Sequence, residues 1–351
     1  MDKHRSRRGR GVLFVLLTGL IGISLSLVAG ELLVRLVHPV PSLYPRWESS
    51  RQYGWVLFEN TKTIHETPGK WRFIYTINEY SYRGAPVPVS NTYAKPNVVV
   101  LGDSYAFGIG VNDDDVFAAV MTRSLRDRVS VVNLGVPGWG LTQEIRRYYE
   151  FGQLYQPAYV ILQFCENDPD DNFESLVTVI KNERFGFQDA QPIERLGILK
   201  HLSDSIIQRS QLYNFLRTVT QRSTKRIVRQ RQAAQYGDTN NVAPPGERFY
   251  CELIDLFARD LKEKGIHLVM IAVIDDLEKY PHIRSEVTAL DSAGLLAYYE
   301  VGDWLKGVVD YGSPEGHSWG ARAHQVIGTR LSELVAADIE GRMRAERKTV
   351  H

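Results

Sequence analysis

The chain has 351 residues, of which 44% are hydrophobic, and this is enough to bury a full core in one α/β domain with appendages. The formal net charge is +1, but it is unevenly distributed. The first ten residues hold five Lys or Arg and one Asp, which gives them a net charge of +4, and the rest of the chain has a net charge of −3. This distribution excludes a globally basic surface that recruits nucleic acid. The two cysteines are too few for a disulfide framework, and none of the nine histidines has a metal-ligand spacing, so we expect no metal.

Residues 1–10 form a basic tip, and residues 11–30 form a segment that we expect to cross a membrane. The nineteen residues from Gly11 to Ala29 carry no charge and are mostly Leu, Val, Ile and Phe. As a helix rising about 1.5 Å per residue, this stretch just spans a hydrocarbon core about 30 Å thick. Arginines favour the cytoplasmic side, so the chain after residue 30 is expected outside the cytoplasm.

A cleaved signal peptide and a buried core helix are the two alternatives for this segment. The apolar region of a signal peptide is usually shorter, and it ends in small residues at the cleavage site. Here Leu27 stands three residues before a cut after Ala29, which is a poor match. We therefore favour a retained signal anchor.

Residues 31–94 are rich in aromatic residues and prolines, and we expect them to form a linker or a small β-rich cap. From residue 95 to 340 strand-like and helix-like segments alternate, which predicts βαβ units on a parallel sheet. Residues 341–351 are left as a tail. The expected strands are 97–101, 129–133, 158–164 and 267–274, and the expected helices are about 115–127, 141–154, 246–264 and 320–338.

The alternation is interrupted by an insertion at 172–245. It contains a predicted helix from Ile206 to Val219 and a basic run made of Lys225, Arg226, Arg229 and Arg231. Such a run is usually the solvated face of a helix, and the alternative is a site for an anionic polymer or a lipid headgroup. Insertions at a catalytic edge often form lids or substrate walls.

Four polar segments lie where this arrangement brings them together. Loops that leave the carboxyl ends of parallel strands share one edge of the sheet. Three segments directly follow an expected strand, and the fourth comes just before the last helix. They are Gly102-Asp103-Ser104, Asn133-Leu134-Gly135, Asn167-Asp168, and Ser313-Pro314-Glu315-Gly316-His317.

These residue types can carry out acyl transfer. A serine is a weak nucleophile unless a base removes its proton, and a tetrahedral intermediate needs donors aimed at its oxyanion. Ser104 is the candidate nucleophile and His317 the candidate base. The candidate oxyanion donors are the N–H of Ser104, the N–H of Gly135 and the amide of Asn167. Taken singly, each segment also has an ordinary explanation, namely a helix cap at Asp103 or Ser104 and turns at Gly135 and Asn167.

The base and its acid each have a competitor. His324 falls in the apolar stripe of the last expected helix, which indicates a histidine packed partly on the core, so we favour His317. A carboxylate would hold the imidazole tautomer and stabilise the imidazolium. Glu315 lies two residues before His317, and Asp310 lies seven residues before it.

Together the four segments resemble those of the SGNH or GDSL hydrolases, a family named for the Ser, Gly, Asn and His of four blocks. These positions are Ser104, Gly135, Asn167 and His317 here, in the family's order. The resemblance covers 97–172 well and 246–337 loosely. The longer strings are similar to the membrane-anchored bacterial branch, which is related to periplasmic polysaccharide O-acetyltransferases and esterases: Gly-Asp-Ser-Tyr-Ala-Phe-Gly-Ile-Gly-Val, Asn-Leu-Gly-Val-Pro-Gly and Tyr-Gln-Pro-Ala-Tyr-Val.

The chain departs from the family pattern at two places. The third block usually begins with Gly, where this chain has Cys165. The fourth usually has Asp two or three residues before the His, where this chain has Pro314 and Glu315. Glu can replace Asp chemically, so the second departure bears on the acid and leaves the serine and histidine in place.

The resemblance implies a three-layer α/β/α, flavodoxin-like fold with a parallel sheet and a cofactor-free acyl-enzyme mechanism. It implies a serine esterase that acts on an acylated small molecule or polysaccharide outside the cytoplasm, anchored by one helix in a bacterial inner membrane. The alternative is an O-acetyltransferase that modifies a cell-surface polysaccharide, because both reactions share the first half. A second alternative is an inactive polysaccharide-binding or scaffold protein.

Overall fold

A computed structural model of the chain describes residues 2–89, 95–173, 175–190, 207–220, 244–273 and 275–349. Its centre is a parallel sheet of five strands in the order β12-β11-β8-β6-β7. The strands are β6 (Asn97–Leu101), β7 (Ser130–Asn133), β8 (Pro157–Phe164), β11 (His267–Ala272) and β12 (Ala297–Glu300).

The order of these strands is that of a flavodoxin-like sheet and reverses at β6, which lies between β7 and β8. Every residue of β6 is buried, as its continuous apolar run predicts for a central parallel strand. In sheets of this kind, sites form in the crevice at the carboxyl ends of the strands where the order reverses. The expected parallel α/β fold is confirmed, and the reversal lies directly below the Gly102-Asp103-Ser104 segment.

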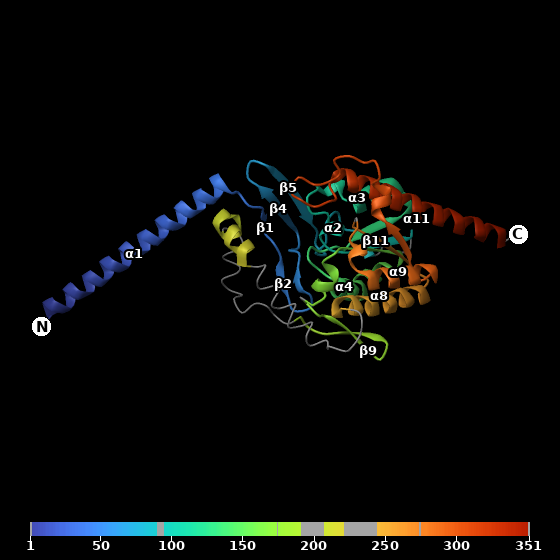
Figure 1. The fold of residues 1–351 in the computed structure, drawn as a ribbon, viewed down its shortest axis with the longest axis horizontal. Helices are drawn as coiled ribbons and strands as arrows, with labels where there is room; N and C mark the ends of the chain where they lie inside the picture. Colours follow the sequence, from blue (N-terminus) through green and yellow to red (C-terminus); the bar gives the residue numbers. More distant parts are fainter. Residues whose placement is uncertain are drawn as a thin grey trace.

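Helices cover both faces of the sheet and complete three layers (Figure 1). On the helix Pro245–Glu263 (α8), Phe249, Leu253, Phe257 and Leu261 recur every four residues, so they form one apolar face against the sheet. One face of the sheet is covered by α4 (Leu141–Glu150), α8 (Pro245–Glu263) and α9 (Pro281–Ser292), and the other by α3 (Phe117–Leu125), α10 (Val301–Trp304) and α11 (Ala321–Thr349).

Most expected elements are present within a few residues of their predicted ends. One exception is α11, which continues to Thr349 instead of ending near 338, and the elements that were not predicted include α9 and β12. The strand β12 has four half-buried residues at the edge of the sheet, Ala-Tyr-Tyr-Glu, and therefore lacks the apolar run that identifies the central strands.

The chain between α1 and β6 forms an antiparallel cap. Its core includes Leu43, Tyr53 and Tyr75, and it packs against Phe107 after β6 and Trp139 after β7. The cap therefore lies against the loops at the carboxyl ends of the sheet strands. One cap sheet consists of β1 (Ser42–Tyr44), β4 (Thr61–Thr67) and β5 (Trp71–Ile77), and a hairpin consists of β2 (Glu48–Ser50) and β3 (Gly54–Val56).

The described part of the insertion contains a hairpin and a helix. The hairpin pairs β9 (Thr178–Lys181) with β10 (Arg184–Phe187). A 3-10 turn (Ile207–Arg209) leads into a helix at 211–220, in agreement with the helix predicted up to Val219. The basic run from Lys225 to Arg231 lies outside the described residues.

The first helix, α1 (Asp2–Val37), extends away from the body of the protein (Figure 1). Its stretch Gly11–Val37 has a mean hydropathy of 2.5 and is long and apolar enough to cross a membrane. None of its apolar window is buried inside the protein, so it is not a buried core helix. Near its end the carboxylate of Glu31 accepts hydrogen bonds from the Ser210 hydroxyl and from the N–H groups of Gln211 and Leu212. Glu31 thereby holds the start of the helix at 211–220.

Substitution of two glycines of α11 would show how closely this helix packs on α3. A Cβ at Gly328 would lie 2.6 Å from the Val120 Cβ and 2.7 Å from the Phe117 carbonyl oxygen, whereas a Cβ at Gly341 would meet nothing within 4 Å. We expect Gly328→Ala to lower the free energy of unfolding by roughly 1–3 kcal/mol because it forces the helices apart. We expect Gly341→Ala to raise it by roughly 0.5–1 kcal/mol through helix propensity. Urea unfolding of the full-length chain in detergent checks both, and equal destabilisation would contradict the close packing.

Candidate active site

The turn from β6 into the short helix α2 (Ser104–Phe107) places Ser104 at the first helical position. Gly102 has a φ of +148°, and a Cβ there would lie 2.6 Å from both the Ala106 Cβ and the Gln163 Oε1. Only glycine fits this turn without displacing its neighbours. The sequence predicted a turn from strand to loop, and the structure shows a turn from strand to helix. As the first residue of α2, Ser104 has an N–H without a partner inside the helix.

The start of α2 is held by a buried amide and a cap. The Oε1 of Gln163, on β8, accepts hydrogen bonds from the N–H groups of Asp103 at 3.2 Å and Ala106 at 3.0 Å. The Oδ1 of Asp103 accepts the Tyr105 N–H at 3.0 Å, which is an N-cap bond. The capping explanation is therefore correct for Asp103, and its other carboxylate oxygen, Oδ2, accepts a long hydrogen bond from the Ser104 hydroxyl at 3.4 Å.

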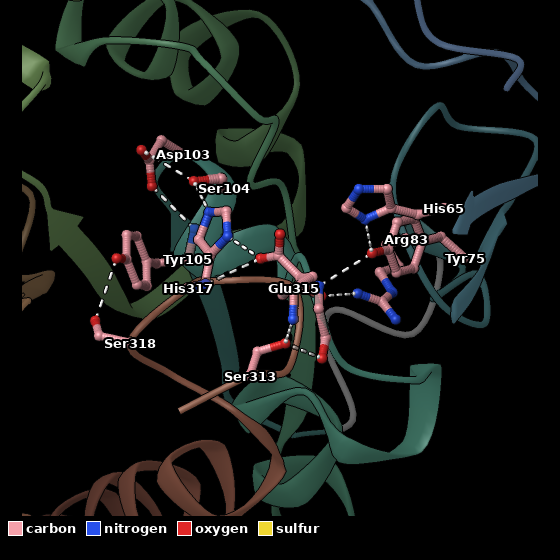
Figure 2. A network of polar contacts seen from close by, with 12 residues as sticks. His65, Tyr75, Arg83, Asp103, Ser104, Tyr105, Ser313, Glu315, His317 and Ser318 are labelled. Carbon is pink, nitrogen blue, oxygen red and sulfur yellow. Dashed lines mark hydrogen bonds and ion pairs between the residues drawn. The ribbon is translucent and has the colours of Figure 1, made fainter. Parts of the chain in front are cut away.

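Ser104, His317 and Glu315 form a continuous chain of hydrogen bonds (Figure 2). The Ser104 Oγ lies 3.0 Å from the His317 Nε2, and the His317 Nδ1 is bonded to the Glu315 Oε1. The same Glu315 oxygen accepts the backbone N–H of His317 at 3.1 Å. Asp310 is exposed. Of the two candidate acids, the structure thus brings Glu315 to the imidazole.

The charge on Glu315 fixes the roles of the two imidazole nitrogens. Only 8% of the Glu315 side chain is exposed, and burial by itself would raise its pKa. The hydrogen bonds that Glu315 accepts from the imidazole and the backbone N–H of His317 outweigh burial and lower the pKa of Glu315. An ionised carboxylate accepts a hydrogen bond from the Nδ1–H of His317. The Nε2 is then unprotonated and can accept the hydrogen bond of the Ser104 hydroxyl.

The two histidines near the last helix have different surroundings. The ring of Tyr105 packs edge-on against His317, with centroids 4.9 Å apart. His324 is fully buried, and its Nδ1 accepts the Phe117 N–H at 3.2 Å. Burial lowers the pKa of His324 to about 3, so it is neutral at neutral pH. The prediction that His324 packs in the core is confirmed.

Gly135 packs directly on α2. A Cβ there would lie 2.7 Å from the Phe107 nitrogen and 2.8 Å from the Ala106 Cβ, so a larger residue would displace the helix that carries Ser104. The Gly135 N–H donates to the Asn133 Oδ1 at 3.1 Å, and the Asn133 Nδ2 donates to the Ala106 carbonyl at 2.7 Å. Gly135 thus lies at the site, and its N–H already has an internal acceptor.

Asn167 reaches the residue next to the serine. Its Nδ2 donates to the Asp103 Oδ2 at 3.3 Å and also to a carboxylate oxygen of Asp171. Its Oδ1 accepts a hydrogen bond from the thiol of Cys165 at 2.7 Å. Burial raises the pKa of Cys165, which keeps the thiol protonated as a donor. Cys165 is therefore part of the support of Asn167, at a position where SGNH hydrolases usually have glycine.

The structure joins Ser104, His317 and Glu315 directly, and it brings Gly135 and Asn167 to the same edge through α2 and Asp103. Two side-chain amides that hold this edge, those of Gln163 and Asn133, had no predicted role, although Asn133 begins one of the four segments. A polar residue inside the otherwise apolar run of β8 was a usable signal for Gln163. Among the described residues, no group of three or more His, Cys, Asp or Glu is arranged to hold a metal ion.

Two buried carboxyl groups lie close to the site without complete hydrogen bonding. Glu144 on α4 and Asp168 at the start of α5 (Asp168–Asp171) are 2% and 1% exposed. The Glu144 Oε1 and the Asp168 Oδ1 have no hydrogen-bond partner. Burial raises the pKa of both groups well above the usual range, and the charge of Asp103 adds to this effect. We expect the pair to keep a proton at neutral pH.

The raised pKa of Glu144 makes stability depend on pH. In the unfolded chain Glu144 ionises near pH 4.3, whereas the native protein keeps the proton. Stability is therefore lost as the pH rises from about 4.5 toward the native pKa of Glu144. We expect Glu144→Gln to lose less unfolding free energy between pH 5 and pH 8 than the wild type in urea titrations. Glu263→Gln, on the exposed side of α8, serves as control, and parallel losses in all three chains would contradict the assignment.

Sequence comparison finds no protein-family model and no curated protein that matches this chain. Structure comparison finds similar solved chains. One, described as lipolytic and of the G-D-S-L family, is from Desulfitobacterium hafniense DCB-2, with 11% identity, a TM-score of 0.41, and coverage of 68% of this chain and 99% of that chain. A lipase from a goat rumen metagenome has 12% identity, a TM-score of 0.39, and coverage of 68% and 96%. A carbohydrate acetylesterase from Sinorhizobium meliloti has 11% identity, a TM-score of 0.38, and coverage of 69% and 99%.

Proposed function

We propose that this chain is a serine hydrolase of the SGNH type that cleaves ester bonds through an acyl-enzyme on Ser104. The observation that carries the proposal is the chain of hydrogen bonds from Ser104 through His317 to Glu315 at the carboxyl-end edge of the sheet. Nucleophile, base and acid in this order are the arrangement that activates a serine for attack on a carbonyl. The resemblance of the four sequence segments supports the same reaction.

The proposed reaction has two halves. The Ser104 Oγ attacks the carbonyl carbon of the ester while its proton passes to the His317 Nε2, and Glu315 stabilises the imidazolium. His317 then gives this proton to the leaving alcohol oxygen, and the acyl group stays on Ser104. In the second half a water molecule loses a proton to His317 and attacks the acyl carbon. The acid leaves, and the proton returns to Ser104.

The developing oxyanion would be stabilised beside the start of α2. The N–H of Ser104 is the first proposed donor, because it has no partner inside the helix. The Gly135 N–H and the Asn167 amide are the further proposed donors. Each would have to exchange its present acceptor, Asn133 or a carboxylate, for the oxyanion. Hydrogen bonds at catalytic sites often reach their final geometry only with substrate bound.

We propose that α1 holds the enzyme in a bacterial inner membrane, with the catalytic domain in the periplasm. The support is the apolar stretch Gly11–Val37 and the basic residues before it, which favour the cytoplasmic side. The substrate would then be an acylated small molecule or polysaccharide outside the cytoplasm.

Removal of the nucleophile or the base tests the proposed reaction. We expect Ser104→Ala and His317→Ala each to lower kcat for hydrolysis of an aryl acetate by about 10⁴-fold or more, and the double variant to be no slower than the single ones. Ser124→Ala, which removes an exposed hydroxyl from α3, is the matched control and should keep full activity. Unchanged turnover in Ser104→Ala would refute the serine mechanism.

The same assay with an oligosaccharide acceptor separates hydrolysis from transfer. Hydrolysis predicts that acetate release is independent of the acceptor. Acetylated sugar that forms only with the acceptor and with an intact Ser104 would instead identify an O-acetyltransferase. If no acyl group is released or transferred by the wild type, the inactive binding or scaffold protein becomes the better description.

The retained anchor has its own test. We expect the full-length chain to stay in the membrane pellet after extraction with alkaline carbonate, since a spanning helix is not released by loss of surface charge interactions. A chain without residues 2–30 should appear in the soluble fraction. Intact mass of the pelleted protein distinguishes a retained anchor from a cleaved signal peptide. Release of the full-length chain would contradict the anchor.

A further inference from the structure

Gly110 lies where the cap, the loop after α2 and the loop of Glu315 meet. Its N–H donates to the hydroxyl of Tyr75 on β5 at 3.0 Å, and its carbonyl accepts the Ser313 hydroxyl at 2.8 Å. Its φ is +82°, and a Cβ there would lie 2.8 Å from the Glu315 Cγ and 2.9 Å from the Ser313 Cβ. Glycine is therefore required both by the backbone and by the close approach of the acid loop.

Ser313 ties the acid loop to Gly110. Because its hydroxyl donates to the Gly110 carbonyl, its Oγ is an acceptor for the Glu315 N–H, at 3.4 Å. The Ser313 N–H donates to the His317 carbonyl at 2.8 Å, and the Ser313 carbonyl accepts the Gly316 N–H at 3.1 Å. The loop from 313 to 317 is thus a closed turn with one anchor point on Gly110.

On the side of the cap, Gly110 is held by the hydroxyl of Tyr75, which is itself held by hydrogen bonds. The Tyr75 oxygen accepts the Gly110 N–H, so its own proton is directed to the His65 Nδ1, 2.8 Å away. Burial lowers the pKa of His65 to about 4, which leaves the imidazole neutral and Nδ1 able to accept. Tyr75 is fully buried. Its hydroxyl is therefore held between one donor and one acceptor, and Figure 2 shows its contact with His65.

Arg83 holds the backbone that carries Gly110. Its guanidinium lies over the Tyr75 ring, 4.4 Å from the centroid, and pairs with Asp113 at 2.8 Å. It also donates to the carbonyl of Phe107, the last residue of α2, and to the carbonyls of Gly108 and Val111 in the loop that follows. The loop on both sides of Gly110 is thus fixed by the side chain of one buried arginine, which is 4% exposed.

We propose that Tyr75, acting through Gly110 and Ser313, positions Glu315 for the catalytic triad, so that the cap is a working part of the active site. This inference rests on the proposed serine hydrolase function. The Tyr75 hydroxyl is bonded to His65 and Gly110 and not to Ser104, His317 or Glu315, so its proposed role is that of a positioning residue. A glutamate has one more rotatable bond than an aspartate and loses more conformational freedom when held. The support from the cap restricts this freedom before substrate binds.

The test is the hydrolysis of an aryl acetate by full-length Tyr75→Phe in detergent. We expect kcat to fall at least about 10-fold with KM nearly unchanged, since a small displacement of a catalytic group costs this much. We also expect the acidic limb of the kcat/KM profile to move to lower pH, because a displaced Glu315 stabilises the imidazolium less. The matched control is Tyr53→Phe, which removes another buried cap hydroxyl, one that is bonded to Glu150 instead.

Ser313→Ala provides the second variant, on the other side of Gly110. It should reproduce both effects of Tyr75→Phe, and the double variant should be no slower than the slower single one, because both act on one chain of contacts. This variant keeps the inference testable if Tyr75→Phe fails to fold.

Two outcomes would overturn the inference and leave the proposed function intact. The first is that Tyr75→Phe and Ser313→Ala both keep the wild-type kcat and pH profile, while Ser104→Ala abolishes activity. The other is an equal loss in Tyr75→Phe and Tyr53→Phe, which would indicate general loosening of the cap. Full activity of Ser104→Ala would instead overturn the proposed function itself.

Discussion

The hydrogen bond between the Glu315 carboxylate and the His317 Nδ1 is the interaction on which the rest of the site depends. It decides which imidazole nitrogen faces Ser104, and it keeps a buried carboxylate ionised against the cost of leaving water. A buried charge of this kind needs a fixed partner and a fixed backbone. The loop of residues 313–317 and the cap behind it supply that backbone, and therefore the geometry of the base depends on parts of the chain far from it in sequence.

The parallel sheet supplies the other half of the site. Its order reverses at β6, the position at which sheets of this kind place their sites, between loops that leave the carboxyl ends of neighbouring strands. Gly102 makes the turn into α2 tight, and Gln163 on the neighbouring strand holds the first turn of that helix. Ser104 is thus fixed by two central, buried strands, while His317 and Glu315 come from a surface loop.

The sequence predicted those features that depend on local pattern. Buried apolar runs identified four of the five strands, and polar residues directly after three of them located Ser104, Gly135 and Asn167. It could not choose between Glu315 and Asp310, because both precede His317 and only backbone geometry decides which carboxylate reaches the imidazole. It could not find Tyr75 or Arg83 either, since their contacts join distant segments and leave no periodic signal. The internal acceptors of Gly135 and Asn167 were equally invisible, because they depend on side-chain orientation.

The distance along the chain between nucleophile and base has a consequence for biogenesis. Ser104 lies in the first βαβ unit, and its base follows 213 positions later, just before the last helix. A polypeptide that is still being synthesised therefore contains Ser104 long before it contains the histidine and carboxylate that are proposed to activate it. The loop of His317 comes directly before α11, which packs on α3. Ester hydrolysis through the proposed triad is thus expected only after the chain has been synthesised beyond His317.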